Sequence, residues 1–71
     1  MKKVAISTEY LTLGQFLKVS GIVQTGGEAK PFLRETEVLV NGEKDSRRGR
    51  KLYGDDIVEI RGERYLIVYE D

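Results

Sequence analysis

A strand that ends in a tight turn constrains the fold of this chain more than any other part of its sequence. Residues 38–40 are Val-Leu-Val, a composition that favours a pleated, half-buried surface. Asn41-Gly42 follows at once, and this dipeptide tolerates the positive φ angles of a two-residue hairpin. The pattern predicts a strand and a hairpin turn, followed by a polar return over residues 43–52 with little strand character.

A dense run of positive charge follows the predicted turn. Residues 44–51 carry five basic side chains and one acidic side chain, Asp45. Residues 1–43 carry five of each sign, whereas residues 52–71 carry two basic and six acidic side chains. A formal net charge of zero therefore conceals a charge dipole, whose basic end could attract a polyanion. The run could equally be an ordinary solvated loop, and its charge alone does not decide between the two.

A short helix is predicted ahead of this region. Thr12 and Gln15 have the spacing of a capping box, in which each side chain satisfies a backbone N–H of the other residue. The helix should run from Leu13 to about Ser20, and Gly21 should end it, because glycine adopts the left-handed conformation at little cost. Its apolar face has the spacing of an amphipathic helix and consists of Leu13, Phe16 and Leu17.

A second helix is predicted after a second capping box, over residues 25–28. Pro31 is poorly placed in a helix that starts there, because its missing N–H would have bonded the Gly27 carbonyl. We therefore expect a loosened first turn around Gly26-Gly27, or a start nearer Gly27, and an end near residue 34 or 35. The apolar face of this helix consists of Ala29, Phe32 and Leu33.

The remaining segments indicate a small sheet. Residues 4–6 could form an edge strand, residues 53–56 a turn, residues 57–60 a strand and residues 61–63 a second tight turn. The last strand, residues 65–69, should place Leu66 and Val68 on one side and Tyr65, Ile67 and Tyr69 on the other. Two short helices packed on a small, mostly antiparallel β-sheet make an α+β fold, which we expect to be a single domain over residues 1–71.

Composition argues against catalysis. The chain has no cysteine and no histidine, which removes the usual nucleophile, general base and metal ligands. The adjacent carboxylates Asp55 and Asp56 fit a turn better than a calcium loop. We expect no enzyme activity, no metal, no cofactor and no small-molecule substrate.

The chain does not have the pattern of a membrane or secreted protein. It contains no apolar run long enough to span a bilayer. The apolar segment after Met1-Lys2-Lys3 is short and is followed by Glu9, unlike a signal peptide. We therefore expect a cytoplasmic protein that does not contact a membrane.

The best candidate binding residues lie in the basic run, because the planar fork of arginine matches phosphate oxygens. Gly49 would let the backbone curve so that several of these side chains face one way. The candidates in the run are Arg47, Arg48, Arg50 and Lys51.

Residues of the predicted helices could extend this basic surface, namely Lys18, Lys30 and Arg34. Gly26 and Gly27 could offer backbone N–H groups to a phosphate at a helix start, or could simply turn the chain into the helix. Tyr53 could stack on a base, although a half-buried tyrosine at a strand end is the more ordinary interpretation.

Several short motifs occur together in a fixed order along the chain: Leu13-x-x-Phe16-Leu17, Gly21-Ile22-Val23, Ala29-Lys30-x-x-Leu33, Val38-x-Val40-Asn41-Gly42 and Gly54-Asp55-x-Ile57. This ordered set resembles the S-four-like RNA-binding domain, a family named after the fourth protein of the small ribosomal subunit. The likeness covers about residues 9–69 and is greatest to the small free-standing bacterial members, the YaaA type. In that type, residues 12–18 and 47–52 look like signature segments.

The resemblance implies the helix pair known as the alpha-L motif, and binding to structured RNA through that pair and the adjacent loop. Carried onto this sequence, it points to Lys18, Lys30, Arg34 and residues 47–51. The arginine that commonly starts the first helix is replaced near residues 12–14, and the serine–arginine pair that commonly opens the second is replaced by residues 25–27. These departures shift the expected contacts towards the arginine run and towards backbone N–H groups.

We therefore expect a monomeric, non-enzymatic protein that binds structured ribosomal RNA or a ribosomal particle and serves ribosome assembly or maintenance. The alternative is a protein-interaction adaptor, steered by its charge dipole to an acidic partner. Its contact surface would be the face of the last strand that carries Tyr65, Ile67 and Tyr69.

Overall fold

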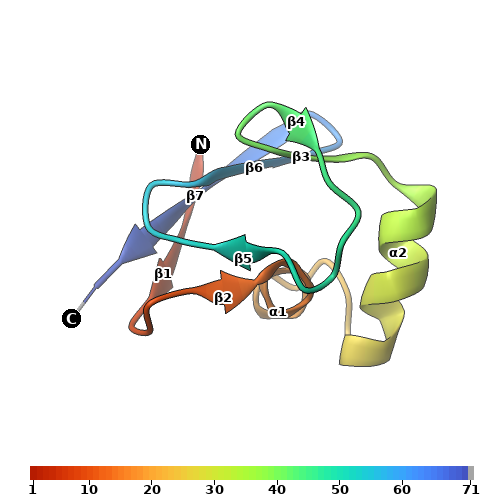
Figure 1. The fold of residues 1–71 in the computed structure, drawn as a ribbon, viewed down its shortest axis with the longest axis horizontal. Coiled ribbons are helices and arrows are strands. Elements are labelled where there is room, and N and C mark those ends of the chain that lie inside the picture. Colours follow the sequence, from red (N-terminus) through yellow and green to blue (C-terminus); the bar gives the residue numbers. More distant parts are fainter. Residues whose placement is uncertain (71) are drawn as a thin grey trace.

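Five strands form one sheet in the computed structural model, which describes residues 1–70 (Figure 1). They are β1 (Lys2–Ile6), β3 (Val38–Val40), β4 (Glu43–Lys44), β6 (Ile57–Ile60) and β7 (Glu63–Tyr69). Their order across the sheet is β1-β7-β6-β3-β4. Neighbours run antiparallel except β1 and β7, which are parallel. The predicted α+β fold with a mostly antiparallel sheet is confirmed.

Two hairpins of the same type build most of this sheet. Asn41 and Gly42 join β3 to β4 with φ angles of 53° and 86°, and Arg61 and Gly62 join β6 to β7 with φ angles of 53° and 78°. Positive φ at both central residues marks a type I′ turn, whose twist matches that of the flanking strands. Both predicted turns are confirmed.

The turn over residues 53–56 is hydrogen-bonded to the hairpin that joins β3 to β4. The Asp56 carboxylate accepts the N–H of Tyr53 at 2.7 Å and the side-chain amide of Asn41 at 3.0 Å. The Asn41 side-chain oxygen in turn accepts the N–H of Ile57 at 2.9 Å. Asp56 is therefore a turn residue, as predicted. Within residues 1–70, no three acidic or imidazole side chains are grouped closely enough to hold a metal ion.

The first helix, α1 (Leu13–Val19), begins and ends as its sequence predicts. The N–H of Thr12 donates to the Gln15 side chain at 2.8 Å, and the N–H of Gln15 donates to the Thr12 hydroxyl at 3.2 Å, which completes the capping box. Gly21, with φ of 79°, takes the left-handed conformation just beyond the helix. Local hydrogen bonding therefore sets both boundaries of α1.

The second helix, α2 (Ala29–Glu35), is preceded by a 3₁₀ turn, η1 (Gly26–Glu28). The predicted loosening of the first turn is confirmed, because the α-helical conformation starts only two residues before Pro31. The Glu28 carboxylate accepts the N–H groups of Gln24 at 2.7 Å and Thr25 at 2.8 Å. In the described part of the chain, neither helix is long and apolar enough to cross a bilayer.

The core lies between the helices and one face of the sheet. Phe16 of α1 packs edge-on against Tyr65 of β7, with ring centroids 5.3 Å apart and ring planes at 82°. The helices contribute Leu13, Phe16, Leu17, Ala29 and Leu33 to this cluster. Alternate residues of the strands meet them, namely Val38, Val40, Val58, Ile60 and Ile67.

The face of β7 that carries Tyr65 and Ile67 is thus the core face. Ile67 is fully buried, and only Tyr69, at the end of the strand, is largely exposed. The expectation that Tyr65, Ile67 and Tyr69 form a contact surface for a protein partner is therefore wrong. The adaptor hypothesis therefore has no support from the surface that was expected to bind the partner.

A second, two-stranded ribbon was not expected from the sequence. β2 (Leu11–Thr12) pairs antiparallel with β5 (Lys51–Leu52), so the polar return contains a second short strand at its end. Leu11 and Leu52 lie opposite each other in this ribbon, and both are buried. Figure 1 shows the ribbon beside α1, where it carries the chain from the basic run back to the sheet.

Candidate nucleic-acid interface

The segment 45–51, here called the basic loop, is fixed to the start of α1 by its backbone. The carbonyl of Arg50 accepts the N–H of Leu13 at 2.7 Å, and the carbonyl of Arg48 accepts the N–H of Gly14 at 2.9 Å. Amides in the first turn of a helix have no partner within the helix. The loop therefore satisfies the start of α1, and α1 in turn positions the loop.

Gly14 permits this close approach. A Cβ atom at position 14 would lie 3.1 Å from Cγ of Arg48 and 3.3 Å from its carbonyl oxygen. A larger residue would push against the same carbonyl that accepts the Gly14 N–H. The glycine inside the first capping box is thus explained by contact with the basic loop and not by a need for positive φ.

Asp45 organises the loop from its N-terminal end. Its carboxylate accepts hydrogen bonds from Nε and Nη2 of Arg47 at 3.1 and 2.7 Å, and from Nη1 of Arg50 at 2.8 Å. The side chain of Asp45 is only 7% exposed. Hydrogen bonds from Arg47 hold the pKa of Asp45 well below its usual range, and the hydrogen bond from Arg50 acts in the same direction. Asp45 is therefore charged at neutral pH and fixes two arginines in one geometry.

The two arginines that contact Asp45 differ in exposure. The Arg47 side chain is 72% exposed, so its guanidinium can bind Asp45 and still face solvent. The Arg50 side chain is 29% exposed, and its guanidinium lies against Asp45. Arg50 therefore acts mainly within the loop, whereas Arg47, the exposed Arg48 and Lys51 present positive charge outwards.

Replacing Asp45 with asparagine should lower the free energy of unfolding by about 1–3 kcal/mol at pH 7, since bonds to a charged group are lost. Because the folded pKa of Asp45 lies below its unfolded value, the contribution is complete above about pH 5. It should shrink from about pH 4 downwards, because Asp45 of the unfolded chain takes up a proton there while the folded carboxylate stays ionised, and it should vanish only when the folded carboxylate is protonated as well. Urea unfolding of both proteins at pH 7, 5 and 3 measures this.

Asp55→Asn is the matched control for Asp45→Asn. It makes the same chemical change at an exposed carboxylate in the turn over residues 53–56, outside the basic loop. It should change stability much less at every pH. A difference between wild type and Asp45→Asn that has already disappeared at pH 5 would contradict the assigned role of Asp45.

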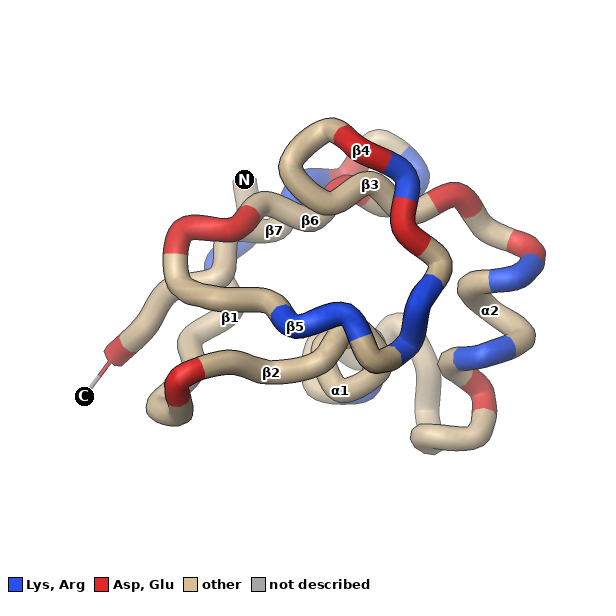
Figure 2. The backbone as a smooth tube through the Cα atoms, viewed as in Figure 1, with Lys and Arg blue, Asp and Glu red and all other residues tan. Residues whose placement is uncertain are grey.

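Helix α2 adds two basic residues beside the loop. Lys30 and Arg34 are exposed and one turn apart, so they share one side of the helix. Arg34 lines a groove of about 270 Å³ together with Asp45 and Ser46 of the loop, and Glu35 and Glu37 line the same groove. Figure 2 shows the positive segments of the loop beside those of α2. These five side chains are here called the basic face: Lys30, Arg34, Arg47, Arg48 and Lys51.

The other candidate residues lie outside this basic face. Lys18 is exposed on α1, one turn beyond Gly14. Gly26 and Gly27 are exposed in η1, at the end of α2 that is far from β3 (Figure 1). The Glu28 carboxylate already accepts two backbone N–H groups there, so a phosphate approaching η1 would meet a negative charge.

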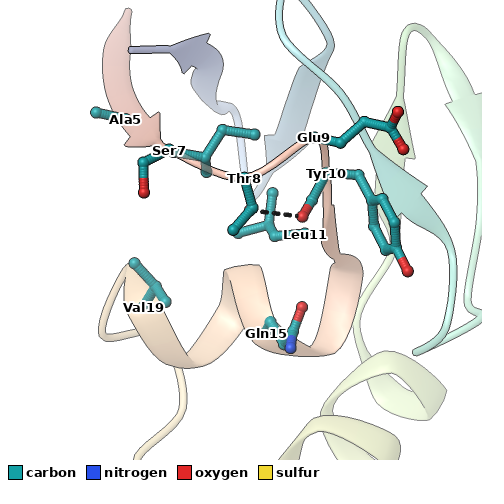
Figure 3. A pocket seen from close by; sticks show the side chains of 9 residues that line it. Ala5, Ser7, Thr8, Glu9, Tyr10, Leu11, Gln15 and Val19 are labelled. Atoms are coloured by element: carbon teal, nitrogen blue, oxygen red, sulfur yellow. Dashed lines mark hydrogen bonds between the residues drawn. The ribbon is translucent and has the colours of Figure 1, made fainter. Parts of the chain in front are cut away.

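A larger hollow has the wrong chemistry for a polyanion. It measures about 610 Å³ and lies between the segment 5–11 and α1 (Figure 3). Its apolar lining includes Ile6, Leu11 and Val19. Among residues 1–70, those that line it include Glu9 but neither lysine nor arginine. The basic face is therefore the better candidate site for a nucleic acid.

Sequence reasoning missed two features of this region. The charge pattern identifies Asp45 only as an opposing charge, although its position two residues before Arg47 allows a local hydrogen bond. The sequence expectations include no role for Tyr10, yet the centroid of its ring lies 5.8 Å from that of Tyr53. The available signal was the short alternation Tyr-Leu-Thr at 10–12 and Lys-Leu-Tyr at 51–53.

Comparison with known proteins agrees with this geometry. Residues 4–68 match the family model of the S4 domain. The chain is 63% identical over 59 residues to the probable ribosome maturation protein RlbA of Bacillus subtilis (strain 168), which covers 83% of each protein. The family match spans both helices, the basic loop and nearly all of the sheet. The chain is therefore a member of the S4 domain family, the RNA-binding family that its ordered motifs predicted.

Proposed function

We propose that this protein binds structured ribosomal RNA through the basic face and serves ribosome maturation in the cytoplasm without catalysing a reaction. The observation that carries the proposal is the fixed position of the basic loop, which α1 and Asp45 hold before any ligand arrives. The family membership and the name of the 63% identical relative support it.

The physical basis of binding is a set of pre-positioned positive charges. Arginine forks bind phosphate oxygens in pairs of hydrogen bonds, which fixes the protein on an RNA backbone. Because the loop is already ordered, little conformational entropy is lost when RNA binds. Acidic segments lie beside the basic ones of α2, but the acidic turn over residues 53–56 lies on the side of the molecule away from α2, so the charge dipole favours an approach with the basic face towards the RNA (Figure 2).

The side chains on the basic face suit binding and not catalysis. Lysine and arginine supply positive charge and hydrogen-bond donors, but neither is an effective general base at neutral pH. A module of this kind acts by occupying or stabilising one RNA structure. We infer that one copy suffices, since the five basic side chains lie on one protomer.

The test is a salt-dependent titration of the purified protein with ribosomal RNA, with duplex DNA as competitor. If four or five phosphate contacts form, the logarithm of the binding constant should fall against log salt with a slope of roughly −3 to −4. The DNA should fail to compete. Equal affinity for both polymers would reduce the basic face to non-specific attraction and overturn the proposal.

A further inference from the structure

The β2–β5 ribbon presents two tyrosines on the side away from the core. Its register pairs Leu11 with Leu52, and one step further in the same antiparallel register Tyr10 lies opposite Tyr53. Successive side chains of a strand point to opposite faces. Both leucines are buried, so the tyrosines and Lys51 share the outer face.

The two rings lean against each other without stacking. Their centroids are 5.8 Å apart and their planes are tilted by 47°. Tyr10 is partly buried, whereas Tyr53 is 43% exposed. Tyr10 therefore supports Tyr53 from one side and leaves part of its ring open to solvent. An aromatic ring restrained in this way loses little conformational freedom when a ligand stacks on it.

Lys51 joins this tyrosine pair to the basic face. Its ammonium group lies 4.8 Å from the centroid of the Tyr10 ring, within the range of a cation–π contact. The contact follows from the ribbon, because Lys51 is diagonal to Tyr10 across the two strands. The open ring and the phosphate-binding charges are thus neighbours on one surface.

We propose that Tyr53 stacks on an unpaired base of the bound RNA, that Tyr10 positions the Tyr53 ring, and that Lys51 binds a phosphate beside that base. The inference rests on the proposed function, since the basic face must first bring the RNA to this surface. It adds a chemical class to the target, namely a helix interrupted by a bulge, an internal loop or a terminal loop.

The requirement for an unpaired base follows from the shape of RNA. In an A-form helix the bases stack on one another, and the deep, narrow major groove does not admit side chains. An aromatic ring can therefore receive only a base that has left the stack. A ring beside a positive charge matches both parts of a nucleotide, the flat base and the phosphate.

Two blunt-ended RNA duplexes that differ at one position provide the test, because a terminal loop would itself offer unpaired bases. One duplex is fully paired, and the other carries a single bulged 2-aminopurine, whose fluorescence falls when it stacks. Tyr53→Leu should weaken binding to the bulged RNA about tenfold. It should change binding to the paired RNA by less than about twofold, because the basic face is unaltered. The fluorescence decrease should occur with wild type and not with Tyr53→Leu.

Tyr53→Phe is the matched control, because it keeps the ring and removes only the hydroxyl. It should bind both RNAs as wild type does and should retain the fluorescence decrease. If Tyr53→Leu weakens binding to both RNAs equally, or to neither, the inference is overturned and the proposed function still stands. Wild type that binds neither RNA would overturn both together. Circular dichroism confirms that each variant is folded.

Discussion

Simultaneous replacement of Arg47, Arg48 and Arg50 with alanine is expected to weaken binding to ribosomal RNA by about a hundredfold, since two exposed guanidiniums each lose a charge-assisted hydrogen bond. The slope of log affinity against log salt should become shallower by about 1.5 to 2 units, since the phosphate contacts of Arg47 and Arg48 are lost. The variant should still fold, because none of the three side chains belongs to the core, but with lower stability, because Asp45 loses its bonds from Arg47 and Arg50. Circular dichroism at the assay temperature checks that it is folded. Filter binding over a range of salt concentrations measures both quantities.

Two matched variants separate geometry from charge. Lysine at the same three positions keeps the charge and removes the planar forks, so it should restore the salt slope but only part of the affinity. Alanine at Lys2, Lys3 and Arg64 removes three positive charges from the strands β1 and β7. If that variant weakens binding as much as the arginine variant does, the basic face is not the site.

Alanine at Phe16 is expected to leave the protein largely unfolded at 37 °C. Phe16 is fully buried and packs against Tyr65, and truncation of a buried phenylalanine costs about 3–5 kcal/mol. In a chain of about 70 residues, a single hydrophobic core rarely supplies more than about 3–5 kcal/mol of stability. The loss therefore consumes most of it. Thermal unfolding followed by circular dichroism measures the effect.

Phe16→Leu serves as the control, since it keeps most of the apolar volume and should cost much less. An alanine variant with a melting temperature within a few degrees of wild type would contradict the position of Phe16 at the centre of the core.

Local signals allowed much of the fold to be predicted. The Thr12–Gln15 capping box and Gly21 mark both ends of α1, and Asn41-Gly42 marks the first hairpin. Each of these signals lies within a few residues of the structure that it specifies. Pro31 likewise indicated a loosened first turn before α2, because the cost of its missing N–H is also local.

Pairings between distant segments left no comparable signal. The parallel pairing of β1 with β7 joins residues 2–6 to residues 65–69, and no local pattern specifies such a partner. The strands β2 and β5 have two residues each, so the short alternation around each of them is too brief to specify a partner. Their pairing depends on the burial of Leu11 against Leu52, a property of the assembled fold.

The candidate site shows the same division. Positive charge at residues 47–51 is evident from the sequence, and so is the likeness to an RNA-binding family. The sequence does not show which of these charges face outwards, because that depends on the buried position of Asp45. The bonds of Asp45 distinguish Arg50, which acts within the loop, from Arg47, which remains exposed. The contacts of each site residue with RNA stay predictions.

The bonds between the basic loop and α1 make the stability of one depend on the other. Leu13 and Gly14 donate their amides to the loop, and Leu13 is at the same time fully buried in the core. Any ligand that binds only the ordered loop adds its binding free energy to the folded state. RNA would then act as a folding ligand for this chain, so that variants of residues 45–51 change affinity and melting temperature together.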